Sequence, residues 1–290
     1  TGRHFIDANV AYLTRAPFFR NSYISPRTSN FTIPGLTNER IASADINYNL
    51  RSPYIKARLS AYYTKFMDQT ELKTFYYESA DLRTFVNYMM TNIEKVHKGL
   101  ELGVELKVTS TITLDAAAGL GTYQYKSRPN VTITQDNIGT IVGERVIYIK
   151  NFYIPSTPQT AAMFAFKYAS PKYWFFDASV SYFDDIYIDF APERRTPEAL
   201  SGLEPNDPLR KKITDQTGLP SAYLVDASIG KSWRIKKYYI NLNFQVTNIL
   251  DNTDFKTGGY EQLRNVNTEE SLSKYPPRNY YSFGRTYYLN

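Results

Sequence analysis

Long stretches of alternating apolar and polar residues are the feature that most constrains the fold of this chain. In YYINLNFQVTNILDN, residues 238–252, one set of alternate positions is apolar and the other polar. The apolar set is Ile240, Leu242, Phe244 and Val246, and the polar set is Asn241, Asn243, Gln245 and Thr247. Successive side chains of a β-strand point to opposite sides, so the pattern predicts a strand with one apolar face. The pattern alone leaves open whether that face meets a protein core or lipid.

Ten segments of the chain show this two-residue period. Most are about 10 to 15 residues long, whereas strands average about 5 or 6 residues in soluble proteins and need about 9 to 11 to cross a membrane. The segments lie near residues 3–14, 41–50, 54–68, 97–109, 111–127, 157–169, 173–186, 221–231, 237–248 and 278–290. Their length favours strands of a transmembrane β-barrel.

The connections between the segments alternate between short and long. Short ones lie at 51–53, about 110, 170–172 and 232–236. Long ones lie at 15–40, 69–96, 128–156, 187–220 and 249–277. Outer-membrane barrels have tight periplasmic turns at one end and long extracellular loops at the other, so the alternation predicts that orientation.

Charged residues avoid the apolar faces. Five of these faces carry no charge, among them Leu100 to Val108 and Trp174 to Tyr182 at alternate positions. A Lys or Arg at the lipid midplane costs about 2 to 4 kcal/mol, which explains such a bias in a membrane strand. The opposite faces carry Asp45, Lys56, Arg58, Glu101, Glu105, Lys107, Asp115, Lys167, Asp177 and Asp226.

Counting from the short turns predicts a cross-strand ladder of charges on the inner wall. In this register Asp45 lies opposite Arg58, and Arg58 lies roughly opposite Glu105. The facing of the last segment, 278–290, stays undecided, because Arg285 shares a face with aromatic residues there.

Composition supports this class of protein. The chain has 26 Tyr among its 290 residues, and tyrosine suits sites with one dry and one wet side. No run of about 18 apolar residues encodes a transmembrane helix. The net charge of +6 is spread along the chain without the basic stripe that nucleic-acid binding needs. Thr1 leads directly into a strand-like segment, so the chain is expected to be processed or a fragment.

Several motifs resemble the C-terminal barrel half of TonB-dependent outer-membrane receptors in the form common in the Bacteroidetes phylum. They are YLTRAPFF at 12–19 with SPRT at 25–28, HKGLELGVELK at 97–107, VTNILDN at 246–252, TGGYEQ at 257–262 and YPPRNYY at 275–281. Their order and spacing cover essentially the whole chain.

The resemblance implies an all-β fold of about ten antiparallel strands, the last ten of a 22-stranded barrel. Residues 1–290 would be one part of that barrel, with the first twelve strands, the plug and the TonB box lying outside this sequence. A few residues after YYLN at the C-terminus are expected to be absent too. The implied function is uptake of a scarce solute with energy supplied through TonB, without catalysis or cofactors, in the outer membrane of a bacterium.

The implied partners are lipid, the remaining barrel and plug, TonB and a small-molecule, glycan or peptide ligand. A surface lipoprotein is left open, since TGGYEQLRN departs from the sequence typical of the glycan-importing branch. The forked guanidinium of arginine and the phenol ring of tyrosine suit anionic or ring-bearing ligands, so residues of three long loops are candidate ligand contacts. They are Tyr76, Tyr77, Arg83, Arg194, Arg195, Tyr260 and Arg264.

The sequence leaves four other interpretations open. A self-closed ten-stranded barrel resembles the omptin proteases, with Asp184, Asp185 and His97 as candidate catalytic residues. A passive porin is a second, although ten strands enclose little free space. A soluble β-sandwich is a third, and it needs a second apolar layer. A calcium clip at Asp184, Asp185 and Asp189 is a fourth, without the EF-hand pattern; zinc-protease, esterase and phosphate-loop motifs are absent.

Overall fold

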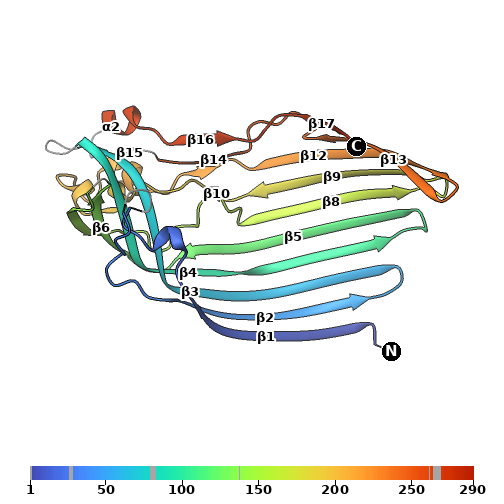
Figure 1. Ribbon diagram of the computed structural model, residues 1–290, viewed down its shortest axis with the longest axis horizontal. Coiled ribbons are helices and arrows are strands. Elements are labelled where there is room, and N and C mark those ends of the chain that lie inside the picture. The colour runs from blue at the N-terminus through green and yellow to red at the C-terminus, as the bar shows by residue number, and fades with distance from the viewer. Residues whose placement is uncertain (1, 26–28, 79–82, 137, 261, 264–268) are drawn as a thin grey trace.

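The computed structural model describes residues 2–25, 29–78, 83–136, 138–260, 262–263 and 269–290. Ten strands follow one another in a single antiparallel path of a 13-stranded sheet, as Figure 1 shows. They are β1 (His4–Arg15), β2 (Glu39–Arg51), β3 (Ile55–Glu78), β4 (Arg83–Lys107), β5 (Ile112–Tyr125), β8 (Thr160–Ala169), β9 (Trp174–Asp184), β12 (Ala222–Ile235), β13 (Tyr238–Thr247) and β17 (Thr286–Leu289). The predicted all-β fold and its ten alternating strands are confirmed.

Shorter elements fill the long connections. The strands are β6 (Asn130–Gln135), β7 (Ile141–Val146), β10 (Ile186–Tyr187), β11 (Gly218–Leu219), β14 (Lys256–Gly259), β15 (Gln262–Leu263) and β16 (Arg278–Tyr281). The helices are η1 (Phe19–Asn21), η2 (Pro192–Arg195), η3 (Glu198–Leu200), α1 (Pro208–Thr214) and α2 (Glu269–Lys274). No helix in the described ranges is long and apolar enough to cross a membrane.

The apolar faces of the ten-strand sheet have no protein packed against them. In β13, Ile240, Leu242 and Phe244 are 52%, 46% and 41% exposed, and Val10 in β1 is 86% exposed. A soluble sandwich buries such a face under a second sheet. No second layer covers these residues in the part of the chain that the structure describes, so this outer face needs an apolar solvent.

The opposite, inner face is polar, and its register corrects the predicted ladder. Asp45 pairs with Tyr62, and Arg58 pairs with Asn49 and with Gly103. The first short turn is centred on residues 53–54, where Ser52 N–H donates to the Ile55 carbonyl, two residues beyond the assumed centre. Moving the turn centre by two residues shifts the pairing by four, which keeps every side chain on its face but changes each partner.

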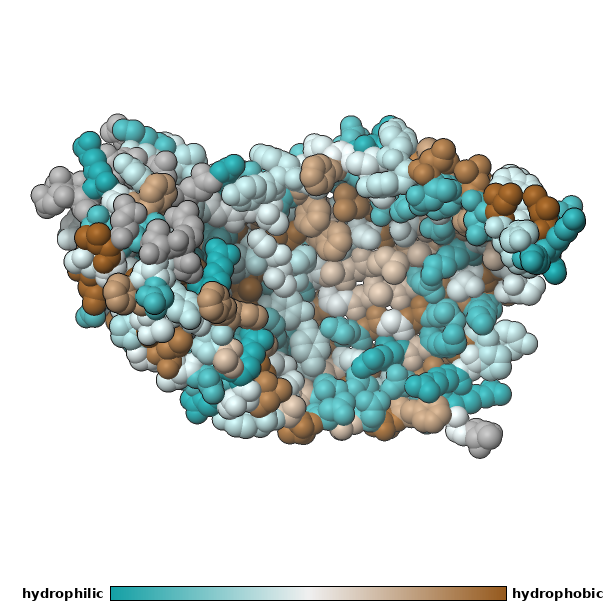
Figure 2. All heavy atoms as spheres, viewed as in Figure 1, coloured by the Kyte–Doolittle hydropathy of each residue, from teal (hydrophilic) through white to brown (hydrophobic). Residues whose placement is uncertain are grey.

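A different set of ion pairs crosses the inner face. Lys56 Nζ lies 2.8 Å from Glu105 Oε1, and Lys167 Nζ lies 2.6 Å from Asp115 Oδ2. These charges lie near the short turns, and Figure 2 shows hydrophilic side chains gathered there over β2 to β5. The charges are therefore inside the curved wall, as the alternation predicted.

The structure overturns the prediction that residues 69–96 form a loop. β3 and β4 continue as a hairpin to Glu78 and Arg83, with a register irregularity between Phe66 and Glu71. Beyond the irregularity the hairpin pairs with β6, which pairs with β7, and β15 runs parallel to β3. The long hairpin, curving upward at the left of Figure 1, is the platform on which the other loops are built.

The main hydrophobic core lies in these loops. Its buried members are Phe75, Val86, Tyr88, Met90, Ile93, Tyr125, Val131, Ile133, Ile147, Ile149, Phe190 and Ala191. Tyr77, Phe152, Ile154 and Tyr260 pack against its edge. Burial of about 1.5 to 3 kcal/mol per large apolar side chain makes this loop core a folded unit on top of the sheet.

The structure divides the last predicted segment, 278–290, into two strands, β16 and β17. β16 pairs with β14, and only β17 joins the wall, where Tyr287 pairs with Val246 and Leu289 with Phe244. Tyr287 and Leu289 thus share the outer apolar face. Arg285 lies before β17, where its backbone N–H donates to Asp251 Oδ1.

The sheet is open at both edges. β1 pairs only with β2, and β17 pairs only with β13, so the described strands do not close on themselves. Figure 1 places these two strands at opposite sides of the sheet. This contradicts the alternative of a self-closed ten-stranded barrel.

Candidate functional site

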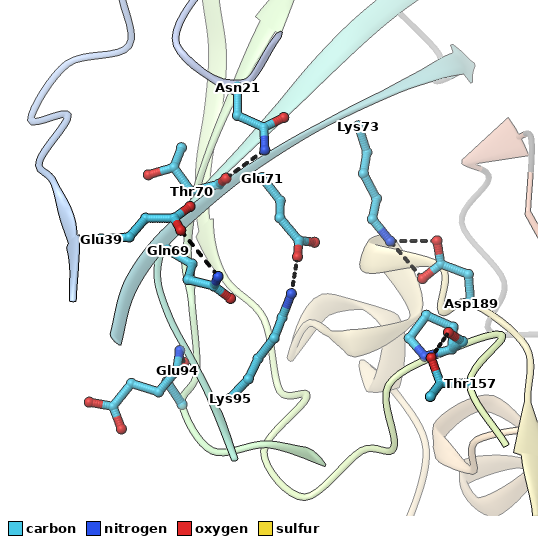
Figure 3. A network of polar contacts seen from close by, with 12 residues as sticks. Asn21, Glu39, Gln69, Thr70, Glu71, Lys73, Glu94, Lys95, Thr157 and Asp189 are labelled. Carbon is cyan, nitrogen blue, oxygen red and sulfur yellow. Dashed lines mark hydrogen bonds and ion pairs between the residues drawn. The ribbon is translucent and has the colours of Figure 1, made fainter. Parts of the chain in front are cut away.

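The long loops come together at one end of the sheet, where polar contacts fasten them to the platform hairpin. Figure 3 shows Lys73 of β3 pointing at Asp189 and Lys95 of β4 pointing at Glu71. Lys73 Nζ lies 2.6 Å from Asp189 Oδ1 and 4.3 Å from the centre of the Phe190 ring. The segment that follows β10 is therefore held to the hairpin by an ion pair.

Glu71 links this ion pair to a second one. Burial raises the pKa of Glu71, but Lys95 and Lys73 together outweigh burial and lower it below its usual value. The carboxylate therefore stays ionised between two ammonium groups. The arrangement fixes the loops but offers no free group to a ligand.

Arg194 and Arg195 lie in the loop cluster but are not exposed. Arg194 is 7% exposed, its guanidinium lies 4.5 Å from the centre of the Tyr260 ring, and its Nη2 donates to the Tyr275 carbonyl at 2.9 Å. The structure thus brings together two predicted site residues, Arg194 and Tyr260. Their contact organises the cluster rather than presenting two free side chains.

Arg195 fastens the short helix α1. It is 6% exposed and donates to the carbonyls of Ile213, Thr214 and Asp215 at the C-terminal end of α1. Carbonyls at a helix C-terminus lack intrahelical donors and carry partial negative charge, so an arginine stabilises them. Burial lowers the pKa of Arg195 to about 10.

Three other predicted residues lie on the platform hairpin. Tyr77 packs on the loop core together with Tyr260, whereas Tyr76 makes an edge contact with Phe85, with ring centres 5.5 Å apart. Arg83 is exposed at the start of β4. β15 runs beside Tyr76 and Tyr77, so the first and third loops do meet. Arg264 lies outside the described residues.

A pocket of about 470 Å³ opens among these loops. Its walls come from the segment after β7, from η2 and η3, and from α1. The polar and aromatic side chains among them are Tyr148, Phe152, Arg194, Arg195, Thr196, Arg210 and Thr214. The sequence prediction missed Tyr148, Phe152 and Arg210, because nothing in their local pattern indicates that residues 60 positions apart meet. We call this hollow the arginine pocket.

A second hollow, of about 560 Å³, lies on the inner wall of the sheet. Small residues of β4 and β5 form its floor, including Gly103, Ala117 and Gly119, while Arg58 and Phe183 stand at its sides. It is a shallow part of the curved wall beneath the loops.

The motif VTNILDN has a structural role at the loop end of the sheet. Asn248 is buried with φ of +51°, and its side chain donates to the carbonyls of Asn252 and Phe283 and accepts from the Asn252 N–H. Its own N–H donates to Asp226 Oδ1 at 2.7 Å. Asn adopts positive φ more readily than other residues with a Cβ atom, which explains its place here. The motif, which follows β13, therefore holds the segment that connects β16 to β17.

The candidate protease residues are not brought together. His97 contacts the rings of Phe66 and Tyr123, whereas Asp184 accepts from Tyr182 and Asp185 accepts from Thr160. β5 and β8 separate β4 from β9, so His97 and the aspartates are about 14 Å apart at a strand spacing of about 4.8 Å. No group of three acidic or histidine side chains in the described ranges could hold a metal ion, which removes the calcium clip.

Glu193 is a half-buried acid next to the arginine pocket, with 13% of its side chain exposed. Tyr88 donates a hydrogen bond to its carboxylate, and Arg145 Nε lies 3.5 Å away. Burial and the charge of Glu198 raise the pKa of Glu193 from 4.5 to about 7. Between these values the folded loops hold a proton that the unfolded chain releases, so the loops lose stability as pH rises through the window.

We expect the Glu193→Gln substitution to remove this loss. The glutamine stays neutral, so the loops should gain about 1 to 3 kcal/mol of stability at pH 8 and little at pH 5. Hydrogen exchange of residues 190–200 in the full receptor, corrected for the intrinsic effect of pH, measures the gain. Glu204→Gln, at an exposed position in the same loop, is the control. An unchanged pH dependence in Glu193→Gln would contradict the prediction.

A protein-family model described as TonB dependent receptor-like, beta-barrel, matches residues 7–249. The chain belongs to this family. Its fold also resembles the copper transporter OprC, with a TM-score of 0.58 at 14% identity, covering 99% of this chain and 37% of that one. A variant of the ferric enterobactin receptor PfeA from Pseudomonas aeruginosa gives a TM-score of 0.58 at 13% identity, covering 100% of this chain and 38% of that one. No curated protein matches the chain.

A third solved structure, the ferric-catecholate import receptor Fiu from E. coli K12, has a TM-score of 0.55 at 14% identity. The match covers 100% of this chain and 32% of that one, so the chain spans about a third of the length of these proteins. The TonB-dependent family is one of outer-membrane receptors, which confirms the predicted location. The exposed apolar face of the sheet is therefore the face that meets lipid.

Proposed function

We propose that residues 1–290 are the C-terminal part of the barrel of an outer-membrane receptor that takes up a scarce extracellular solute. Energy reaches it through TonB, and the remaining strands and the plug belong to the same receptor. The family assignment supports this proposal, as does the coverage of 37% and 38% of the two longer structures.

The observation that carries the proposal is the open sheet. β1 and β17 each have one neighbour, and all twelve residues of β1 are exposed. A membrane strand with an unpaired edge leaves backbone N–H and C=O groups without partners in lipid, at several kcal/mol each. Further strands that pair with β1 and β17 satisfy these groups.

The Bacteroidetes form of the receptor rests on the sequence motifs alone. We propose that the chain has this form because SPRT, VTNILDN and YPPRNYY follow one another in this order along it. The TGGYEQ stretch argues for a branch other than the glycan importers. A surface lipoprotein is accordingly left out of the proposed mechanism.

The seven candidate loop residues stay a prediction for ligand binding. Arg194 and Arg195 donate to backbone carbonyls of the loops, and Tyr77 and Tyr260 pack against the same loop core. In the proposed mechanism the loops capture the solute, and TonB then pulls on the plug so that the solute enters through the lumen.

Solute depletion from growth medium tests this function. Cells with the receptor, without it and without TonB are grown in the same medium, and the solutes that remain are compared by mass spectrometry. We expect at least one solute to be depleted only when both proteins are present. Depletion that needs the receptor but persists without TonB would overturn the proposal and favour a passive pore.

A further inference from the structure

The arginine pocket contains buried positive charge that no carboxylate in the described part of the chain neutralises by contact. Arg194 and Arg195 are adjacent in sequence, each more than nine-tenths buried. Every acceptor of their hydrogen bonds is neutral: the Tyr260 hydroxyl and the carbonyls of Tyr275, Ile213, Thr214 and Asp215. Neighbouring buried charges of one sign are costly unless an opposite charge joins them.

Arg210 adds a third guanidinium to the same pocket. It lies on α1 and is half-buried, and within the described residues its side chain donates one hydrogen bond, to the Leu203 carbonyl at 3.3 Å. It forms no ion pair with any carboxylate among the described residues, and its remaining N–H groups are available. The carboxylate of Asp215, at the end of the helix, acts on the charge of Arg195 from a distance, but it lies 4.0 Å from Lys211 and does not line the arginine pocket.

The walls of the arginine pocket suit a flat ring. Tyr148 is 43% exposed and lies under the guanidinium of Arg128, at 4.9 Å from the ring centre. Phe152 lies under Arg195 at 4.5 Å, and Leu200 and Pro197 add apolar surface. Aromatic rings and guanidinium planes stack well on planar groups. The volume of about 470 Å³ is that of a small-molecule site.

We propose that the arginine pocket binds a small anionic molecule that carries a planar ring. Arg210 forms the direct contact with its carboxylate or phosphate group, Tyr148 stacks on its ring, and Arg194 and Arg195 supply a fixed positive potential. The inference rests on the proposed function, since it names the class of solute that the loops of the receptor capture. A forked guanidinium matches such an anion with two parallel hydrogen bonds.

The test is calorimetric titration of the full receptor in detergent with three probes. Phenyl phosphate has both the ring and the charge, inorganic phosphate has only the charge, and phenol has only the ring. We expect phenyl phosphate to bind with a Kd of about 1 mM, as a fragment of this size does. The other two probes should bind at least about tenfold more weakly.

Substitutions locate the binding. Arg210→Gln should weaken phenyl phosphate binding about tenfold and Tyr148→Leu about threefold, whereas Arg210→Lys, which keeps the charge but loses the forked pair of donors, should weaken it about three- to fivefold. Arg234→Gln, at a short turn at the other end of the sheet, is the matched control and should change nothing. The Arg210 side chain makes a single hydrogen bond among the described residues, so we expect its substitution to leave the loops folded.

Three results would overturn the proposal. The first is that phenyl phosphate does not bind. The second is that it binds the Arg210→Gln receptor as tightly as the receptor without the substitution. The third is that inorganic phosphate binds as tightly as phenyl phosphate. The last result would indicate a lipid headgroup, which has no ring. Failure here leaves TonB-dependent solute depletion intact, whereas failure of the proposed function removes that depletion and leaves phenyl phosphate binding unchanged.

Discussion

Leu102→Arg should lower the unfolding free energy of the receptor by about 2 to 4 kcal/mol. Leu102 lies at the centre of the membrane part of β4, on the outer face, and is 45% exposed in this chain. The arginine would place its charge in the middle of the hydrocarbon layer. Unfolding of the purified receptor in lipid bilayers, followed through titration with denaturant, measures the loss.

Leu106→Arg is the matched control for depth. Leu106 lies on the same face of the same strand, one residue from the end of β4, and is 38% exposed. Near the membrane surface the cost falls to about 0 to 1 kcal/mol. Equal costs at Leu102 and Leu106, or no cost at Leu102, would contradict the assignment of this face to lipid.

Asn248→Leu should lower stability by about 3 to 5 kcal/mol. The substitution removes three partly buried hydrogen bonds of the side chain, to the Asn252 and Phe283 carbonyls and from the Asn252 N–H, at about 0.5 to 1.5 kcal/mol each. Leucine at φ of +51° adds about 1 to 2 kcal/mol of strain. Hydrogen exchange measures the effect: on substitution, protection should fall more in the segment leading into β17 than in β12 or β5.

Asn241→Leu is the control for this change. Asn241 is an exposed residue of β13, the strand that ends just before Asn248, and its side chain makes no hydrogen bond within the described residues. We expect a loss below about 1 kcal/mol. Similar losses at both positions, with β17 still protected, would show that Asn248 does not hold the end of the wall.

Alternation predicted the wall of the sheet well because each wall strand has one outer and one inner face. Alternation did not predict the part of the platform hairpin that extends beyond the wall. Residues 86–90 of β4 are buried without a break, since the loop core covers one side and the other loops cover the opposite side. Because both of its faces are covered, this part of the platform hairpin has no two-residue period, and its sequence resembles that of an irregular loop.

The register and the site needed information that local sequence does not carry. The first turn lies two residues further along the chain than predicted, which leaves the faces intact and changes the ion pairs. Arg194 and Arg195 resemble exposed ligand contacts in sequence, but their partners are backbone carbonyls from other parts of the chain. A hydrogen bond to a carbonyl places no demand on the identity of the partner residue, so no sequence pattern reveals it.

The most direct test of the central claim is the intact mass of the polypeptide that carries this sequence, purified from the outer membrane. An open ten-strand sheet needs strands that pair with β1 and β17. We therefore predict a chain well above 33.4 kDa, whose additional residues supply those strands and a plug. A folded, monomeric barrel of 33.4 kDa would contradict the account.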